Sequence, residues 1–412
     1  MKDICLKNMQ LASAFSNHTD IISAVSSLSA QLAGKVEPSF MVCYYTENYD
    51  ATSLADELKN AFPGIPFHGC SSCQGVMTDK GYHIAPAVAL LAIDDLESSA
   101  YGAYYQTFSN NSPTAESVTQ CTVKAVEGAI DSANRKGELP SLLLLHASIG
   151  NEELIIDAIK NKFGFHIPLI GGSAADNGNF QHSSFLTDKG AASEGVSVSV
   201  FYPSTSISTY FSTGYLPTEI YGVATKVKGR TLYTIDNQPA LEVYKEWIYE
   251  HSGKREVGHY LFNQTMAYPL GRIVGTLYEK PFYKLSHLLR STEDGGVEVF
   301  SNIKEGERLY LMQGSSELLV SRASRVVEAA KNENIFSFPL NGGINIFCAG
   351  SMVLVKDRMD EVCDLLRYSY RESPFICPFT FGEQGRFLNE ENVHGNLMAS
   401  TALFYANTIE NR

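Results

Sequence analysis

Two turns rich in small residues carry the first side chains of this sequence that could do chemistry. Residues 69–73 read Gly-Cys-Ser-Ser-Cys, and residues 171–176 read Gly-Gly-Ser-Ala-Ala-Asp. Glycines let a turn bring its backbone N–H groups close to a bound carboxylate or a similar acceptor. Ser173 adds a hydroxyl group, and Asp176 could accept a hydrogen bond from an amino group. The pattern favours a small polar ligand; the alternative is a structural turn in which Asp176 caps the next element.

Cys70 is a candidate nucleophile, because His68 lies two residues away and residues two apart in a strand share one face. The spacing of Cys70 and Cys73 also resembles half of a zinc or redox motif. Structural zinc needs four ligands, however, and no second cysteine pair lies nearby in the sequence. We therefore expect no enzyme and no metal. A thiol-dependent enzyme that uses Cys70, a pocket wall and plain packing remain the alternatives for this turn.

A third group of candidates lies in the C-terminal part of the chain. Glu383 stands in a glycine-containing turn at 382–385, where its carboxylate could bind an ammonium group. His394 could bind a carboxylate or orient Glu383, and Arg272 could clamp a carboxylate. The alternative is a salt-bridged loop that closes onto Arg386 or Arg272. The predicted ligand-binding residues are Gly69, Cys70, Ser71, Gly171, Gly172, Ser173, Asp176, Arg272, Glu383 and His394.

The elements that must position the first two turns occur twice, 102 residues apart. Residues 38–44 match residues 140–146, and residues 65–71 match residues 167–173. Each copy reads as a buried strand, a helix, a second strand and a tight turn. Turns at strand ends are where α/β sheets commonly bind ligands. The pattern predicts internally duplicated strand–helix–strand–turn units at 38–93 and 140–202.

The rest of the chain predicts an α/β fold of mixed sheets with helices on their outer faces. We place two domains at residues 1–225 and 226–412. Asn17 or Thr19 is expected to cap a helix that runs through Ile21 and Leu32. One helix is expected over 318–331, and the C-terminal part reads as a more distant echo of the repeated unit.

Bulk properties narrow the class of partner. The 412 residues carry a formal net charge of −13, which argues against nucleic acid and anionic membranes as partners. The longest apolar runs are too short to span a bilayer, so we expect no membrane insertion. Eight cysteines are too few for a disulfide scaffold of this length. The expected location is the cytoplasm.

Four segments in this order resemble the FIST family of bacterial and eukaryotic sensory proteins: residues 69–72, 171–176, 235–240, and 381–385 with His394 downstream. The resemblance covers an N-terminal and a C-terminal FIST domain. It implies signal transduction by a sensor of small ligands, with amino acids or similar metabolites as the suggested class. The output would pass to a separate partner such as a histidine kinase or a diguanylate cyclase. Gln384 and Cys73 depart from the residues usual in the family.

The same resemblance implies an alternative function, because one bacterial subgroup binds haem and reports nitric oxide to a histidine kinase. Covalent haem is excluded, since the sequence contains no Cys-x-x-Cys-His motif. A single axial imidazole leaves no local signature, so non-covalent haem stays open as a cofactor. Its candidate ligands in the N-terminal domain are His68, His83, His146, His166 and His182.

Overall fold

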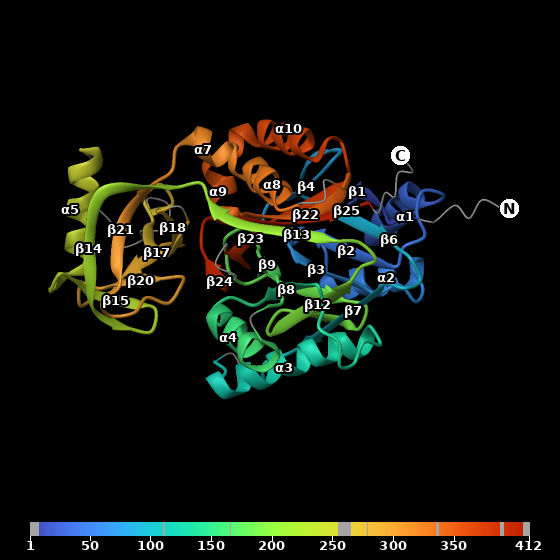
Figure 1. The fold of residues 1–412 in the computed structure, drawn as a ribbon, viewed down its shortest axis with the longest axis horizontal. Coiled ribbons are helices and arrows are strands. Elements are labelled where there is room, and N and C mark those ends of the chain that lie inside the picture. Colours follow the sequence, from blue (N-terminus) through green and yellow to red (C-terminus); the bar gives the residue numbers. More distant parts are fainter. Residues whose placement is uncertain are drawn as a thin grey trace.

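The computed structural model describes residues 8–109, 112–164, 166–253, 265–277, 279–334, 338–387 and 391–406. These residues form a mixed α/β fold with three sheets, as Figure 1 shows. Two sheets and their helices make up the larger body. The third sheet lies to one side of it, and helix α5 packs on this sheet.

The first sheet has six strands and consists, in spatial order, of β1 (Gln10–Ser16), β6 (Val88–Asp94), β2 (Phe40–Tyr45), β3 (Phe67–Ser71), β10 (Phe185–Thr187) and β11 (Gly190–Ala192). The second has eleven strands, and its main path is β13 (Ile207–Thr213), β25 (Met398–Tyr405), β22 (Leu340–Cys348), β23 (Phe375–Arg386), β9 (Leu169–Ser173), β8 (Leu142–Ala147), β12 (Val196–Tyr202) and β7 (Ala100–Gln106). Off this path lie β4 (Gly75–Thr78), β5 (Gly81–Ile84) and β24 (Asn392–Gly395). Strands from both sides of residue 225 therefore share one sheet.

The third sheet has eight strands, in the order β18 (Lys280–Ser286), β17 (Leu270–Leu277), β21 (Arg308–Gln313), β14 (Leu216–Lys228), β15 (Thr231–Ile235), β20 (Val297–Val299) and β19 (Leu288–Ser291), with β16 (Gln238–Pro239) beside β15. The two end strands, β18 and β19, are separated in the chain by His287 alone. The sheet therefore curls back towards its own beginning. Helix α5 packs on it through Tyr244, Trp247 and Ile248.

The helices cover the outer faces of the sheets. They are α1 (Ile21–Leu32), α2 (Ala51–Ala61), α3 (Ala115–Ser132), α4 (Glu152–Phe163), α5 (Ala240–Ser252), α7 (Ser316–Val320), α8 (Arg322–Asn332), α9 (Ala349–Leu354) and α10 (Met359–Tyr370), with a 3-10 turn, η1, at Lys356–Arg358. In Figure 1, α3 and α4 lie at the bottom of the larger body, where α3 contacts β7 and β12. Helices α8 and α10 lie at its top, where α8 contacts β13 and β25. None of the described helices combines the length and the apolar character that crossing a bilayer requires.

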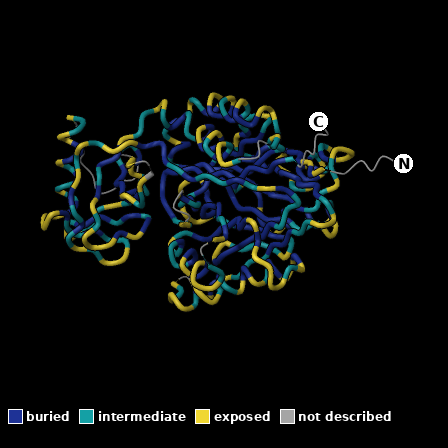
Figure 2. The backbone as a smooth tube through the Cα atoms, in the orientation of Figure 1, coloured by how far each residue is buried: buried dark blue, intermediate teal, exposed yellow. Residues whose placement is uncertain are grey.

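The central strands are apolar on both faces because both faces are covered, which is typical of buried parallel pairs. In β2, Val42 and Tyr44 face the core between the two large sheets, while Met41 and Cys43 face α1 and α2. Figure 2 shows this as a continuous buried centre, with exposed residues concentrated on the helices and turns. The centre of the larger body is therefore occupied by buried residues.

Two segments form the β–α–β arrangement that the sequence predicts. Strand β2, helix α2 and strand β3 form one unit, and β8, α4 and β9 form the other; the strands of each unit pair in parallel. A third parallel pair, β22 and β23, is connected through α9 and α10. The buried strand predicted at the start of the first unit is confirmed as β2, Phe40–Tyr45.

Three local predictions need correction. The N-cap of α1 is Asp20, whose carboxylate accepts the backbone N–H of Ser23, so neither Asn17 nor Thr19 has that role. The helix expected over 318–331 is two helices, α7 and α8, divided at Ser321. Strand β1 was not predicted, because it pairs with β6 and gains its stability from that distant partner.

Candidate functional site

Helix α4 begins with two glutamates that point away from its own axis towards other parts of the chain. Its N-cap, Asn151, makes no side-chain cap bond. Glu152 and Glu153 occupy the first turn, where a negative charge is favoured by the helix dipole. Glu152 is only 1% exposed, so its charge requires partners inside the protein.

Arg230 supplies the counter-charge from the turn between β14 and β15. Its Nη2 atom lies 2.7 Å from Glu152 Oε2 and 2.5 Å from Glu153 Oε2. The other oxygen of Glu152 accepts the hydroxyl group of Ser173 at 2.8 Å. One guanidinium group therefore joins the start of α4 to the eight-stranded sheet.

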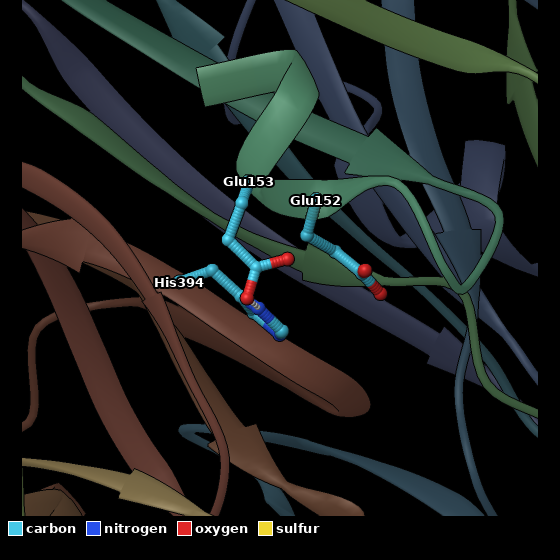
Figure 3. A group of neighbouring side chains, drawn as sticks. All are labelled: Glu152, Glu153 and His394. Carbon is cyan, nitrogen blue, oxygen red and sulfur yellow. Dashed lines mark ion pairs between the residues drawn. The ribbon is translucent and has the colours of Figure 1, made fainter. Parts of the chain in front are cut away.

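His394 and Asn302 complete the group around Glu153. Nδ1 of His394 lies 3.1 Å from Glu153 Oε1, and the same oxygen accepts the backbone N–H of Asn302 at 2.7 Å. Figure 3 shows the two glutamates extending from α4 and His394 reaching them from β24. Burial disfavours ionisation of Glu153, but His394, Arg230 and the Asn302 N–H outweigh it and hold the pKa of this carboxyl below its usual range. Glu153 is therefore a carboxylate at neutral pH.

A cavity of about 260 Å³ opens beside this group. The acidic side chains that line it are Glu153, Asp157, Glu307 and Glu391. The basic side chains are Lys160, Arg272, Lys284 and Lys304, together with His394. They come from three parts of the chain that meet at the cavity. These are α4, the eight-stranded sheet with its loop before β21, and β24 with Glu391 directly before it.

Arg272 and Lys284 face each other across β17 and β18, which are antiparallel. Arg272 is 3% exposed and donates to the hydroxyl groups of Ser286 and Ser301, to the carbonyl of Asn302 and to Glu307. Lys284 makes no hydrogen bond or ion pair with any of the described residues. Burial, and then the charge of Arg272, lower the pKa of Lys284 to about 8. A lysine without an anionic partner thus stands in the cavity wall.

A metal ion is not needed to explain the acidic group. Glu152, Glu153 and His394 each offer a ligand atom, and these atoms lie within 4.8 Å of one another. All four carboxylate oxygens already accept hydrogen bonds, from Ser173, Arg230 and the backbone N–H groups of Gly150 and Asn302. The arrangement is that of an ion-pair network, in which Arg230 already neutralises negative charge of the two glutamates.

The structure brings two of the predicted residues, Arg272 and His394, to the cavity wall. Ser173 lies behind it, bonded to Glu152. Glu383 is fully buried in β23, where Oε2 accepts the N–H of Met398 and Oε1 has no hydrogen-bond partner within the described part of the chain. Burial raises the pKa of Glu383 to about 8, although hydrogen bonds oppose the shift.

The two small-residue segments were predicted as turns, but Gly69, Cys70 and Ser71 lie in β3, and Gly171, Gly172 and Ser173 lie in β9. The two segments lie against each other, and neither lines the cavity beside Glu153. The N–H of Ala175 donates to the carbonyl of Ser71 at 3.0 Å. A Cβ atom on Gly69 would lie 1.6 Å from Cys43 O, and one on Gly171 would lie 2.0 Å from Leu145 O. These glycines allow neighbouring strands to approach closely. The same holds at Gly172, where a Cβ would lie 2.1 Å from the hydroxyl oxygen of Thr380.

Asp176 organises the loop that follows the second turn. Its carboxylate accepts the backbone N–H groups of Gly178, Asn179, Gln181 and His182. Burial opposes ionisation, but these bonds outweigh it and lower the pKa of Asp176. This geometry fits the structural alternative given above for this aspartate.

Cys70 is fully buried in the apolar core, and burial raises the pKa of its thiol well above the ordinary value. His68 bonds Ser197 and Ser199 on β12, so its ring nitrogens are occupied by those hydroxyl groups. Buried cysteines without a nearby cation are normally inert. None of the histidines considered for haem lines a cavity that we describe.

The sequence interpretation did not single out Glu152, Glu153, Arg230 or Lys284. One signal could have indicated the glutamates: at the offset of 102 residues they stand where the first copy has Asp50 and Ala51. No local signal marks Arg230, because the turn Gly229–Arg230 reads as an ordinary hairpin connection.

The fold and the site together define a mixed α/β protein with a charged cavity where three parts of the chain meet. The FIST N domain matches residues 39–238, and the FIST C domain matches residues 240–386. The chain belongs to the FIST family.

Among curated proteins, the uncharacterized protein MJ1623 of Methanocaldococcus jannaschii is 26% identical over 338 residues. The match covers 76% of this chain and 62% of that protein. Among solved structures, the cyanuric acid hydrolase of A. caulinodans gives a TM-score of 0.37 at 9% identity, over 97% of this chain and 100% of that one. PurL of T. maritima, complexed with ATP, gives a TM-score of 0.22 at 9% identity, and the match covers 97% of this chain and 72% of that one. Neither structural likeness is close enough to inform function.

Proposed function

We propose that this protein is a sensor that binds a small charged metabolite in the cavity between α4, the eight-stranded sheet and β24. The observation that carries the proposal is the lining of that cavity, in which groups of both charge signs converge from three parts of the chain. Its volume of about 260 Å³ is below the roughly 300–1,000 Å³ of drug-sized pockets, which favours a ligand the size of a metabolite. We propose binding without turnover.

An amino acid is the ligand class that we propose first. Its ammonium group would find the carboxylate of Asp157, one turn after Glu153 on α4. Its carboxylate would find cations at Lys284 and Lys304, on the eight-stranded side of the cavity. None of the described residues forms an ion pair with Lys284, so a ligand carboxylate would gain a charge-assisted bond there.

We propose that the bound ligand is reported to a separate partner, such as a histidine kinase or a diguanylate cyclase. FIST domains belong to a family associated with sensing in signal transduction, which supports this reading. A ligand that bridges α4 and the eight-stranded sheet would favour one arrangement of these two parts over others. Such a difference in affinity between arrangements is what a sensor requires.

The test is a thermal-shift and calorimetric screen of the wild-type protein with the common amino acids. A ligand present at about 100 times its Kd stabilises the folded state by about 2.7 kcal/mol, which is readily measured as a shift in Tm. The variant Lys284→Met should lose the shift. It should remain folded, because it removes a positive charge that stands opposite Arg272.

The matched control is Lys136→Met, which changes an exposed lysine beside a different cavity and should keep the full shift. Equal loss of the shift in both variants would place the ligand elsewhere. Wild-type protein that no amino acid stabilises would contradict the amino-acid assignment.

We also propose that residues 38–93 and 140–202 are copies of one ancestral unit. The support is their common register: Met41 pairs with Phe67, and Leu143 pairs with Leu169, at the same offset of 102 residues. Tyr44 and His146, also 102 residues apart, contact each other through Tyr44 Oη and His146 Nε2 at 3.1 Å.

A further inference from the structure

The environment of Lys284 is unusual for a lysine in a sheet. Its position in β18 is directly opposite Arg272 in β17, and like charges in opposite positions destabilise an antiparallel pair. Arg272 cannot turn away, because Ser286, Ser301 and the carbonyl of Asn302 hold its guanidinium group. The fold therefore keeps a lysine beside a fixed cation, at a cost in stability.

The lysine is also confined. A Cβ atom on Gly395 would lie 3.5 Å from Lys284 Cγ, so the stem of the lysine rests against the backbone of β24. Lys284 lines the cavity and its amine feels the charges of Arg272, Glu153, Glu307 and Lys304, while none of the described residues bonds to that amine. A lysine that lines a cavity and has no partner among the described residues is available to react with a ligand.

We propose that Lys284 binds small 2-oxo acids covalently and reversibly, as an imine formed in the cavity beside Glu153 and His394. This inference rests on the proposed function, since it uses the same cavity and names a second ligand class for it. The amine nitrogen attacks the keto carbon, a C–N bond forms, and the oxygen takes up a proton. Loss of that oxygen as water leaves the C=N bond, so one water molecule is released for each ligand bound.

The surroundings supply what the reaction needs. The attacking nitrogen must be neutral, and a lysine becomes a nucleophile near neutral pH when it is desolvated beside another cation. Both conditions hold here, and they lower the pKa of Lys284 to about 8. The neutral fraction at pH 7 is then roughly two hundred times larger than that of an ordinary lysine. The protonated imine that results would lie near the carboxylates of Glu153 and Glu307, which stabilise its positive charge.

The ligand's carboxylate would lie towards Lys304 and His394, so the cavity would accept a short acid whose keto group reaches Lys284. An amino acid has no keto carbon and would bind only through charge. The two ligand classes are therefore distinguished by whether a covalent bond forms, which chemical trapping can detect.

The experiment incubates the full chain with pyruvate, glyoxylate or 2-oxoglutarate and reduces any imine with cyanoborohydride. Peptide mass spectrometry then locates the added mass. We expect the adduct on Lys284, at least about tenfold above any other lysine, given its larger neutral fraction. Lys284→Arg keeps the charge but cannot form the imine, and should lose this adduct. Lys136→Met should retain it.

The outcomes separate the two proposals. An oxo acid that raises Tm without being trapped on Lys284 overturns the covalent inference and leaves binding in the cavity intact. Labelling spread evenly over surface lysines, with no excess on Lys284, overturns it as well. An adduct on Lys284 with no amino acid raising Tm supports the inference and contradicts the amino-acid assignment. The absence of both effects contradicts both.

Discussion

The β2–α2–β3 and β8–α4–β9 units share the order of their elements and the parallel pairing of their strands, and they differ where their helices begin. In both units the pairing of the two strands has the same register: Cys43 pairs with Gly69, and Leu145 pairs with Gly171. Both glycines lie against the carbonyl of the residue opposite, which explains why neither position holds a side chain. The similarity of the two units is a similarity of packing.

The starts of the helices have opposite surroundings. Helix α2 begins at the exposed Asp50, whose carboxylate accepts the N–H of Ser53 at 2.8 Å and so caps its own helix. Helix α4 has no side-chain cap, and its first-turn glutamates bond to Arg230 and His394 from other segments. The candidate site thus arises from what the eight-stranded sheet and β24 bring to one copy of the unit, and the unit alone does not contain it.

The largest effect should come from removing the cation that joins α4 to the eight-stranded sheet. Arg230→Met leaves Glu152 and Glu153 next to each other without their counter-charge, one of them almost fully buried. Breaking a buried pair by deleting one partner costs about 3–5 kcal/mol. Since Arg230 is 20% exposed, we expect the lower end of that range, measured by urea unfolding.

The control is Arg290→Met, which breaks an exposed pair with Glu298 in the same sheet and should cost less than about 1 kcal/mol. The double variant Glu152→Gln/Arg230→Met should recover part of the loss. If Arg230→Met costs no more than the control, the difference between the two helix starts has no energetic meaning.

Much of the scaffold could be predicted from the sequence, because the repeated strands are continuous apolar runs and the turns between them carry glycine. The prediction of a buried strand at the start of each unit, now β2 and β8, rests on such local patterns. The site could not be predicted in the same way. Arg230 is 78 residues from Glu152 in the chain, and Asn302 is 149 residues from Glu153. Only tertiary packing brings these groups together.

The glycines of β3 and β9 show a second limit of prediction from sequence. Small residues at a strand end fit two explanations, close approach of a ligand or close approach of another strand, and the sequence does not distinguish them. At Gly69 and Gly171 a neighbouring strand fills the space. The candidates Arg272 and His394, chosen for their chemistry rather than their spacing, are the ones that reach the cavity.

The second effect is on the pH dependence of stability, and it contrasts Glu153, which has cationic partners, with Glu383, which has none among the described residues. Glu383 is buried opposite Gly172 without a cationic partner, and burial raises its pKa from 4.5 to about 8. Between these values the unfolded chain has released a proton that the folded protein keeps, so stability falls as pH rises. We expect a contribution of up to about 1 kcal/mol per pH unit between pH 5 and pH 8.

Glu153 should act in the opposite direction, because its lowered pKa makes its stabilisation present at neutral pH and lost as pH falls through and below 4.5. Urea unfolding of the wild type and of Glu383→Gln at several pH values between 5 and 8 measures the contribution of Glu383 to the free energy of unfolding. The difference between the two proteins should change steadily with pH. Parallel curves would show that Glu383 does not titrate in this range.

The third effect tests whether the two units are alike at their glycines. Gly69→Ala and Gly171→Ala each place a methyl group against a backbone carbonyl, which cannot move as a side chain can. Overpacking of this kind costs about 1–3 kcal/mol, and we expect similar losses in both variants. Gly34→Ala is the control, since its Cβ would meet open space and only its positive φ of 72° opposes the change. A large loss at one glycine alone would mean that the two turns are not equivalent.

The smallest effect addresses the helix starts directly. Asp50→Ala removes the cap of α2 and should cost about 1 kcal/mol, because the N–H of Ser53 loses its acceptor. Asn151→Ala, at the equivalent place before α4, should cost much less, since the side chain of Asn151 makes no cap bond. The glutamates that follow it already place negative charge at that helix end. Equal losses of unfolding free energy in the two variants would show that α4 depends on the side chain of Asn151. Glu152 and Glu153 would then not substitute for a cap.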